Sequence, residues 1–235
     1  MGKSCILILS SRVMNNNPNN DIVLHKGRDY SPYLFHFVKG EDPLLVLKTI
    51  LYDNALKSQD YMFISYTESP LMAMAYVLNY FQKFKNTISG PMFQPYGIGL
   101  KREMMFVKYN ARPVIYGTEY ERKMICKSLL WRFELMDMKQ RDYSWQREWR
   151  TEGNMLELPE DKEEIIVICR KDKEVDQLKN DTDFPIISFE WLIKNHATDF
   201  DVEAYSFLQS MSKDEIELAR LELEELQGRD NNHDK

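Results

Sequence analysis

The sequence contains no apolar run as long as the roughly 18 residues that a membrane-spanning helix needs, so we expect no membrane span. It also lacks a basic excess. The region from Asp199 to Lys235 holds 11 acidic and 4 basic residues, which leaves 26 acidic and 27 basic residues for the rest of the chain. Broad binding to nucleic acid needs clustered Lys and Arg, and the sequence therefore predicts no general nucleic-acid surface.

Cysteines are few, and the common catalytic motifs are absent. Cys5, Cys126 and Cys169 are odd in number, distant in sequence and in apolar contexts, which indicates reduced core residues in a cytoplasmic protein. No Cys/His spacing indicates zinc. The phosphate loop, the dinucleotide fingerprint, the zinc-protease motif and the G-x-S-x-G elbow are also missing. Any site must therefore be built from other residues, and the chemistry considered below needs no metal.

The order of the expected elements indicates the fold class. Several strands follow one another without long crossovers, which favours an α+β fold with a mixed, largely antiparallel sheet flanked by helices. Gly97 and Gly99 are expected to allow close backbone approach within their strand. Strands are expected at 5–9, 33–38, 61–66, 96–100, 113–116, 145–150, 164–169 and 185–189, and helices near 43–51, 71–84, 119–138 and 172–179.

The acidic C-terminal region is expected to be separate from the main body. We expect a single α+β domain over residues 1–198, followed by an amphipathic acidic helical segment over 199–228 and a disordered tail over 229–235. Ser212 to Glu215 has the capping-box form that begins a helix. The acidic face of this segment could pack on the body or meet a basic partner.

The most informative segment is Ser144 to Arg150, which reads Ser-Trp-Gln-Arg-Glu-Trp-Arg. As a strand, it would place Gln146, Glu148 and Arg150 on one face. That face would present an amide, a carboxylate and a cation to one ligand. The competing interpretation is structural, with Glu148 and Arg150 as an ion pair inside a sheet and Trp145 in the core.

Other residues complete a hypothetical site for glycosyl transfer from NAD. A carboxylate such as Glu148 can bind the ribose 2′-OH and stabilise an oxocarbenium-like transition state. His36 can bind the other ribose hydroxyl, and a ring such as that of Tyr66, within the strand-end segment Ser65-Tyr66-Thr67, can stack on nicotinamide. Arg150 can hold pyrophosphate. The structural alternatives stay open: His36 as a satisfied strand residue and Tyr66 as packing beneath the following helix.

Five blocks of the sequence share a pattern with a known family: Leu34-Phe35-His36-Phe37, Leu47 to Leu51, Ser65 to Leu71, Tyr96 to Glu103, and Arg112 to Tyr116. Over about Tyr33 to Val167 they resemble AbiGi-type abortive-infection proteins. This resemblance implies bacterial defence against phage, where AbiGi is described as the antitoxin half of a pair that acts against a nucleotidyltransferase-like toxin.

The layout of the histidine, the strand-end aromatic and the late Q-x-E pattern also resembles ADP-ribosyltransferases. This resemblance implies such a core over about 33–170, in which His36 and the Ser65–Thr67 segment bind NAD, Glu148 is the catalytic carboxylate and Gln146 orients the acceptor. NAD would be the substrate, and the reaction would modify a host or phage macromolecule or hydrolyse NAD. A non-enzymatic antitoxin that neutralises a toxin partner is the alternative, so whether the protein is an enzyme stays open.

Overall fold

A seven-stranded sheet organises the chain in the computed structural model, which describes residues 31–58, 62–83, 93–138 and 142–218. The strand order is β11-β10-β4-β1-β3-β8-β5, and within this sheet only β10 and β11 are parallel. The expected mixed, largely antiparallel α+β fold is confirmed. The strands are β1 (Tyr33–Lys39), β3 (Phe63–Thr67), β4 (Phe93–Lys101), β5 (Arg112–Pro113), β8 (Glu148–Glu152), β10 (Ile165–Cys169) and β11 (Ile186–Ser188).

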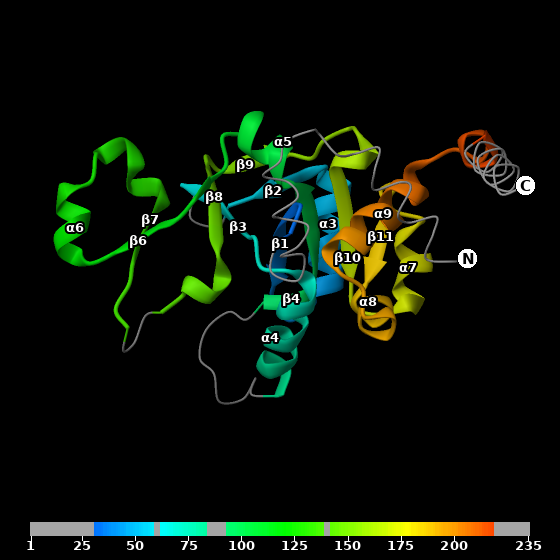
Figure 1. Cartoon of the computed structure of the whole chain (residues 1–235), viewed down its shortest axis with the longest axis horizontal. Helices are drawn as coiled ribbons and strands as arrows, with labels where there is room; N and C mark the ends of the chain where they lie inside the picture. Colours follow the sequence, from blue (N-terminus) through cyan, green and yellow to red (C-terminus); the bar gives the residue numbers. More distant parts are fainter. Residues whose placement is uncertain (1–30, 59–61, 84–92, 139–141, 219–235) are drawn as a thin grey trace, which may run out of the picture.

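Two short ladders lie outside this sheet. The antiparallel one joins β2 (Ala55–Lys57) to β9 (Met155–Glu157), and the parallel one joins β6 (Ile115–Gly117) to β7 (Phe133–Leu135). Figure 1 shows β6, β7 and α6 (Glu119–Met124) together at the left, beside the edge of the sheet that carries β8. We call residues 114–135 the side lobe.

Helices cover both faces of the sheet. On the α3 face, α3 (Pro43–Asp53) packs its Leu47 and Leu51 against strand residues such as Leu34. On the α4 face, α4 (Leu71–Lys83) and α8 (Phe189–Asn195) pack against Phe35 and its neighbours. Leu34 and Phe35 thus face opposite ways, as strand alternation requires. The remaining helices are α5 (Arg102–Val107), α7 (Asp172–Leu178) and α9 (Asp199–Ser210), and no helix of the described residues is long and apolar enough to cross a membrane.

The start of α6 was predicted correctly, but its length was not. Thr118 and Glu121 form the expected capping box. The helix then ends at Met124, a 3₁₀ helix covers Lys127–Arg132, and β7 follows, so the single helix expected over 119–138 is wrong. The reason is long-range pairing, because β7 pairs with β6 and its carbonyl groups accept hydrogen bonds from another strand.

The first part of the C-terminal segment belongs to the packed body. Asp199 is buried, and its Oδ1 accepts a hydrogen bond from the backbone N–H of Leu71 (2.9 Å) at the start of α4. The Gln209 side chain hydrogen-bonds both backbone groups of Ile186. The boundary expected at 198 therefore falls inside one packed unit.

A second helix begins after α9. Ser212 and Glu215 form the expected capping contacts, with Glu215 N donating to Ser212 Oγ (3.3 Å) and Ser212 N donating to Glu215 Oε2 (2.7 Å). Residues 213–218 are helical. The strand expected at 5–9, the continuation of this helix over 219–228 and the tail over 229–235 lie outside the described residues.

The close approach expected at the glycines of β4 is present. A Cβ atom added to Gly97 would lie 2.2 Å from the carbonyl oxygen of His36 on β1. One added to Gly99 would meet side-chain atoms of Ile166 at 2.7 Å and of Phe35 at 2.9 Å. The difference matters because a side chain can shift, whereas the β1 backbone is fixed by its ladder with β4.

We predict that Gly97→Ala lowers the free energy of unfolding by about 3 kcal/mol or more, because the new methyl group overlaps a backbone carbonyl. Gly99→Ala should cost less, about 1–2 kcal/mol, because Phe35 and Ile166 can adjust. Urea unfolding of both variants measures this difference. A larger loss for Gly99→Ala than for Gly97→Ala would contradict it.

Candidate functional site between β1 and β3

A cavity of about 640 Å³ lies between β1 and β3. In the described residues a single registered pair, Phe35 with Thr67, joins these two strands, whereas β1 pairs with β4 from Tyr33 to Lys39. Residues 35–39 and residues 63–67 all line the cavity. Consecutive strand residues point to opposite faces of the sheet. Since every residue of these two segments lines the cavity, the cavity lies between the strands and reaches both faces of the sheet.

His36 occupies the gap between the two strands. Its Nδ1 lies 2.9 Å from the backbone carbonyl oxygen of Ser65, which can only accept, so Nδ1 carries the hydrogen. Burial is the main cause that lowers the pKa of His36 below its usual value, which favours a neutral ring. A neutral ring protonated at Nδ1 keeps Nε2 as a hydrogen-bond acceptor. The imidazole thus satisfies a carbonyl that a closed β1–β3 ladder would have paired.

Glu148 is held by two donors of different kinds. Ser65 Oγ donates to Oε1 (2.6 Å), and Arg150 donates to Oε1 through Nε (2.8 Å) and to Oε2 through Nη2 (3.2 Å). Each carboxylate oxygen can accept about two hydrogen bonds. Among the described contacts Oε1 is therefore saturated, whereas Oε2 can accept one more.

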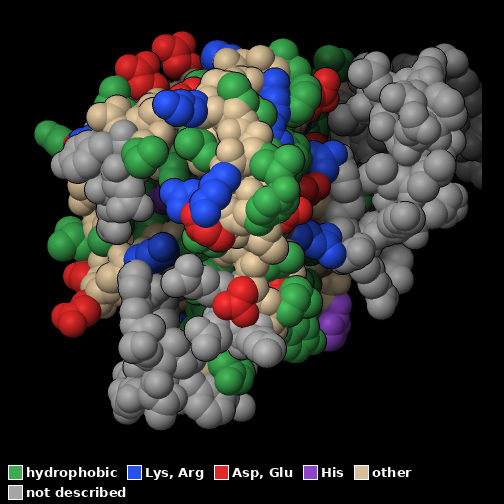
Figure 2. All heavy atoms as spheres, turned by 90° about the vertical axis from the view of Figure 1, so that its left-hand side faces the viewer, with side chains coloured by type: hydrophobic (Ala, Val, Ile, Leu, Met, Phe, Trp, Pro, Cys, Tyr) green, Lys and Arg blue, Asp and Glu red, His purple; other side chains and the backbone are tan. Residues whose placement is uncertain are grey.

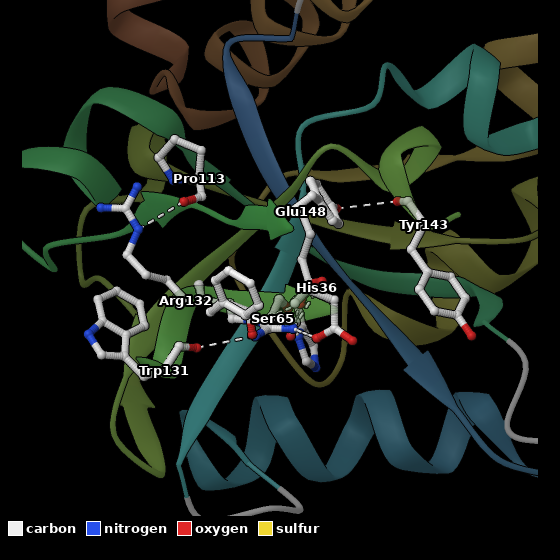
Figure 3. Close-up of polar contacts among 11 residues, drawn as sticks. His36, Ser65, Pro113, Trp131, Arg132, Tyr143 and Glu148 are labelled. Carbon is white, nitrogen blue, oxygen red and sulfur yellow. Dashed lines mark hydrogen bonds and ion pairs between the residues drawn. The ribbon is translucent and has the colours of Figure 1, made fainter. Parts of the chain in front are cut away.

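Ser65 connects the imidazole to the carboxylate. The strand register places the side chains of Ser65, Thr67 and Glu148 on the α4 face. The Cα–Cβ bond of His36 points to the α3 face. The ring of His36 nevertheless reaches the Ser65 carbonyl in the strand gap, and the Ser65 hydroxyl reaches Glu148. Figure 3 shows these three side chains close together at the centre of the site. Both His36 and Glu148 line the cavity.

Arg150 organises the site and has no donor left for a ligand. In addition to its contacts with Glu148, its Nη1 donates to the carbonyl oxygens of Trp131 and Phe133 (3.2 Å each), and its Nη2 donates to Glu134 Oε2 (2.6 Å). A guanidinium has five N–H donors, and all five are used. Among the described contacts no donor is therefore left for the pyrophosphate expected at Arg150, and the residue forms the ion pair with Glu148 that the structural interpretation describes.

The expected strand over 145–150 is wrong in its first half. Ser144–Gln146 forms a 3₁₀ turn, Arg147 has a φ of 44°, and β8 begins only at Glu148. Thr67 Oγ1 donates to the carbonyl oxygen of Gln146, and so it anchors this turn to β3. Gln146 and Thr67 still line the cavity, but Gln146 does so from a turn and not from a row on one strand face.

The aromatic residues take roles different from those expected. Tyr66 is only 2% exposed, lies in the core on the α3 face, and its hydroxyl is 3.2 Å from Thr151 Oγ1. Strand alternation places it opposite Ser65, so its placement favours packing over stacking on a ligand. Trp145, expected in the core, is 38% exposed and lines the cavity beside Tyr143.

Two neighbours of Arg150 could not be recognised from the sequence. Glu134 shares the guanidinium with Glu148, and the Phe63 ring lies 3.9 Å from the guanidinium carbon of Arg150. Glu134 falls within the helix expected over 119–138, and nothing in the sequence relates it to residue 150. Phe63 lies in an expected strand, but its contact depends on the pairing of β3 with β8.

All the predicted site residues line this one cavity: His36, Ser65, Tyr66, Thr67, Gln146, Glu148 and Arg150. A scan against protein families and searches of curated proteins and of solved structures found no match to this chain.

We predict that Arg150→Met lowers the free energy of unfolding by about 3–5 kcal/mol, because it leaves two carboxylates and two buried carbonyl groups without their partner. Adding Glu148→Gln should restore part of this loss, because one uncompensated charge is removed. Urea unfolding of the two single variants and the double variant measures the coupling. Additive effects would show that the two side chains are energetically independent.

Proposed function

We propose that the cavity between β1 and β3 binds NAD as a substrate and that Glu148 is the catalytic carboxylate. One observation supports this most directly. Glu148 is fixed by Ser65 and Arg150 with acceptor capacity left on Oε2, in the same cavity as His36. Oriented acceptors near a developing positive charge are what cleavage of a glycosidic bond requires.

Each residue then has a distinct role. Oε2 of Glu148 accepts a hydrogen bond from the nicotinamide ribose 2′-OH, and its negative charge stabilises the oxocarbenium-like ribose as the bond to nicotinamide breaks. Nε2 of the neutral His36 accepts from another ribose hydroxyl. Arg150 is a positioning residue, because it fixes both oxygens of Glu148. Gln146, at the wall of the cavity, orients the acceptor.

The dimensions and walls of the cavity suit a ligand of this size. A volume of about 640 Å³ is within the roughly 300–1,000 Å³ typical of small-molecule sites. Trp145 and Tyr143 add partly exposed aromatic surface to the wall. Such rings can stack on nicotinamide or adenine, whereas Tyr66 is buried in the core on the α3 face.

We infer the biological setting from the resemblance of several sequence blocks to abortive-infection proteins. We infer a cytoplasmic anti-phage protein that transfers ADP-ribose to a host or phage macromolecule or that hydrolyses NAD when water is the acceptor. Either reaction breaks the bond between the ribose and nicotinamide and releases nicotinamide. The acceptor takes the place of nicotinamide at the ribose carbon and gives up a proton.

We predict that Glu148→Gln lowers NAD turnover by about 100-fold or more, since it removes the charge that stabilises the transition state. Glu152→Gln is the matched control, because Glu152 lies on the same strand but is exposed. Release of nicotinamide from NAD measures turnover, and calorimetry with NAD measures binding. Full turnover by Glu148→Gln, or no heat of NAD binding to the unaltered chain, would refute the proposal.

The second candidate is a non-enzymatic antitoxin, and one observation favours it. Beyond the packed helix α9, residues 213–218 are exposed, with Ile216 45% and Leu218 59% exposed among acidic neighbours. Exposed apolar side chains with acidic neighbours fit a basic partner protein.

This candidate predicts that deletion of residues 212–235, which leaves α9 in place, abolishes neutralisation of a co-expressed toxin, while Glu148→Gln has no effect. Growth after induction of the toxin measures neutralisation. If the truncated chain protects the cells as well as the full chain, the antitoxin role of this segment is excluded.

A further inference from the structure

The segment around the side lobe carries an excess of positive charge in an otherwise acidic protein. From Met104 to Phe133 there are six Lys and Arg residues and two acids, although the whole chain has a net charge of −6. Figure 2 views the molecule from the side on which the lobe lies and shows several Lys and Arg side chains among hydrophobic ones. Two of these cations, Arg112 and Arg132, are connected through β5.

Arg132 and Arg112 meet at the short strand β5. The Nε of Arg132 donates to the carbonyl oxygen of Pro113 (3.1 Å), the residue that directly follows Arg112. Figure 3 shows this contact. This bond places the guanidinium group of Arg132 beside β5, the strand that carries Arg112. The pKa of Arg132 is lowered, first by partial burial and then by the charge of Arg112, which agrees with two like charges in proximity.

Arg112 is held in place by its own contacts. Its Nη1 donates to the carbonyl oxygens of Phe106 (2.9 Å) and Ala111 (2.8 Å). Its guanidinium carbon lies 4.0 Å from the centre of the Phe106 ring, and that ring is 46% exposed. A guanidinium fixed by carbonyl groups and an aromatic ring loses little side-chain entropy when it binds a ligand.

Neither arginine is neutralised by an acid in the part of the chain that the structure describes. Arg112 and Arg132 make no salt bridge there, and their hydrogen bonds go to backbone carbonyl groups. Donors therefore remain on Nε and Nη2 of Arg112 and on both Nη atoms of Arg132. Arg150, one strand away, shows the opposite arrangement, with all its donors used and two carboxylates beside it.

We propose that Arg112 and Arg132 bind a phosphate group. Two guanidinium groups with unused parallel donors match the oxygens of a phosphate, and an anion between them removes their mutual repulsion. The site is next to the proposed catalytic strand, because Arg112 pairs with Arg150 and Val114 N donates to the carbonyl oxygen of Glu148 (2.8 Å). The phosphate comes either from a free nucleotide or from the backbone of a single-stranded nucleic acid, for which Phe106 offers a stacking surface.

The experiment measures binding by the full chain and by the double variant Arg112→Gln/Arg132→Gln. A fluorescent single-stranded oligonucleotide, followed by anisotropy at several salt concentrations, tests the nucleic-acid source. ADP, followed by calorimetry, tests the free nucleotide. The matched control is Arg122→Gln/Lys123→Gln, which removes two exposed cations of α6 from the same basic segment. The unfolding midpoint of each variant verifies that it is folded.

We expect the Arg112/Arg132 variant to bind one of the two probes at least about tenfold more weakly, while the Arg122/Lys123 variant binds it like the unaltered chain. For the oligonucleotide, the plot of the logarithm of the binding constant against the logarithm of the salt concentration has a negative slope. Its magnitude should decrease by about 0.7 for each phosphate that the variant no longer binds. Weaker binding of the oligonucleotide identifies the phosphodiester backbone of a nucleic acid as the source of the phosphate. Weaker binding of ADP alone identifies a free nucleotide. Absence of binding to both probes, or equal binding by all three proteins, overturns the proposal. None of these results depends on NAD cleavage by Glu148.

Discussion

The separation of β1 from β3 after one registered pair is the constraint on which the rest of the site depends. It opens a cavity through the sheet, but it also deprives backbone groups of their ladder partners. An unsatisfied buried carbonyl costs about 1–3 kcal/mol, so the gap can persist only if another group satisfies it. The His36 ring does so at Ser65 and therefore belongs both to the sheet and to the cavity. On the other side of β1, the ladder with β4 holds the strand, and the absence of a side chain at Gly97 permits the close approach of the two backbones.

Arg150 supplies the second constraint. It links β8 to the side lobe through the carbonyl groups of Trp131 and Phe133 and through Glu134, and the same guanidinium fixes Glu148. A buried ion pair often adds little net stability, because desolvation offsets its attraction. Its contribution here is geometric, since it orients the carboxylate and joins the lobe to the cavity. The side lobe and the side chain proposed for catalysis are therefore held by the same guanidinium group.

The features that could be predicted from the sequence are those set by local rules. The apolar run Ile165–Cys169 became β10, and the Thr118 capping box began α6. His36, Ser65 and Glu148 also line one cavity, but their assembly depends on the pairing of distant strands and not on a local rule. The errors arose where distant contacts decide. The helix expected over 119–138 is replaced in part by β7, because β7 pairs with β6. The strand expected over 145–150 is interrupted, because Thr67 and Ser69 hold a turn at 144–146.

The contacts of Glu148 make a purely structural role the weaker interpretation of this residue. An ion pair that only holds two segments together is best enclosed, with every oxygen satisfied and apolar packing around it. Arg150 meets this description, since its five donors are saturated. Glu148 does not, because Oε2 keeps an acceptor site and the carboxylate lines a cavity wide enough for a ligand. A saturated cation beside an unsaturated carboxylate is the arrangement expected when the arginine positions the acid and the acid meets the substrate.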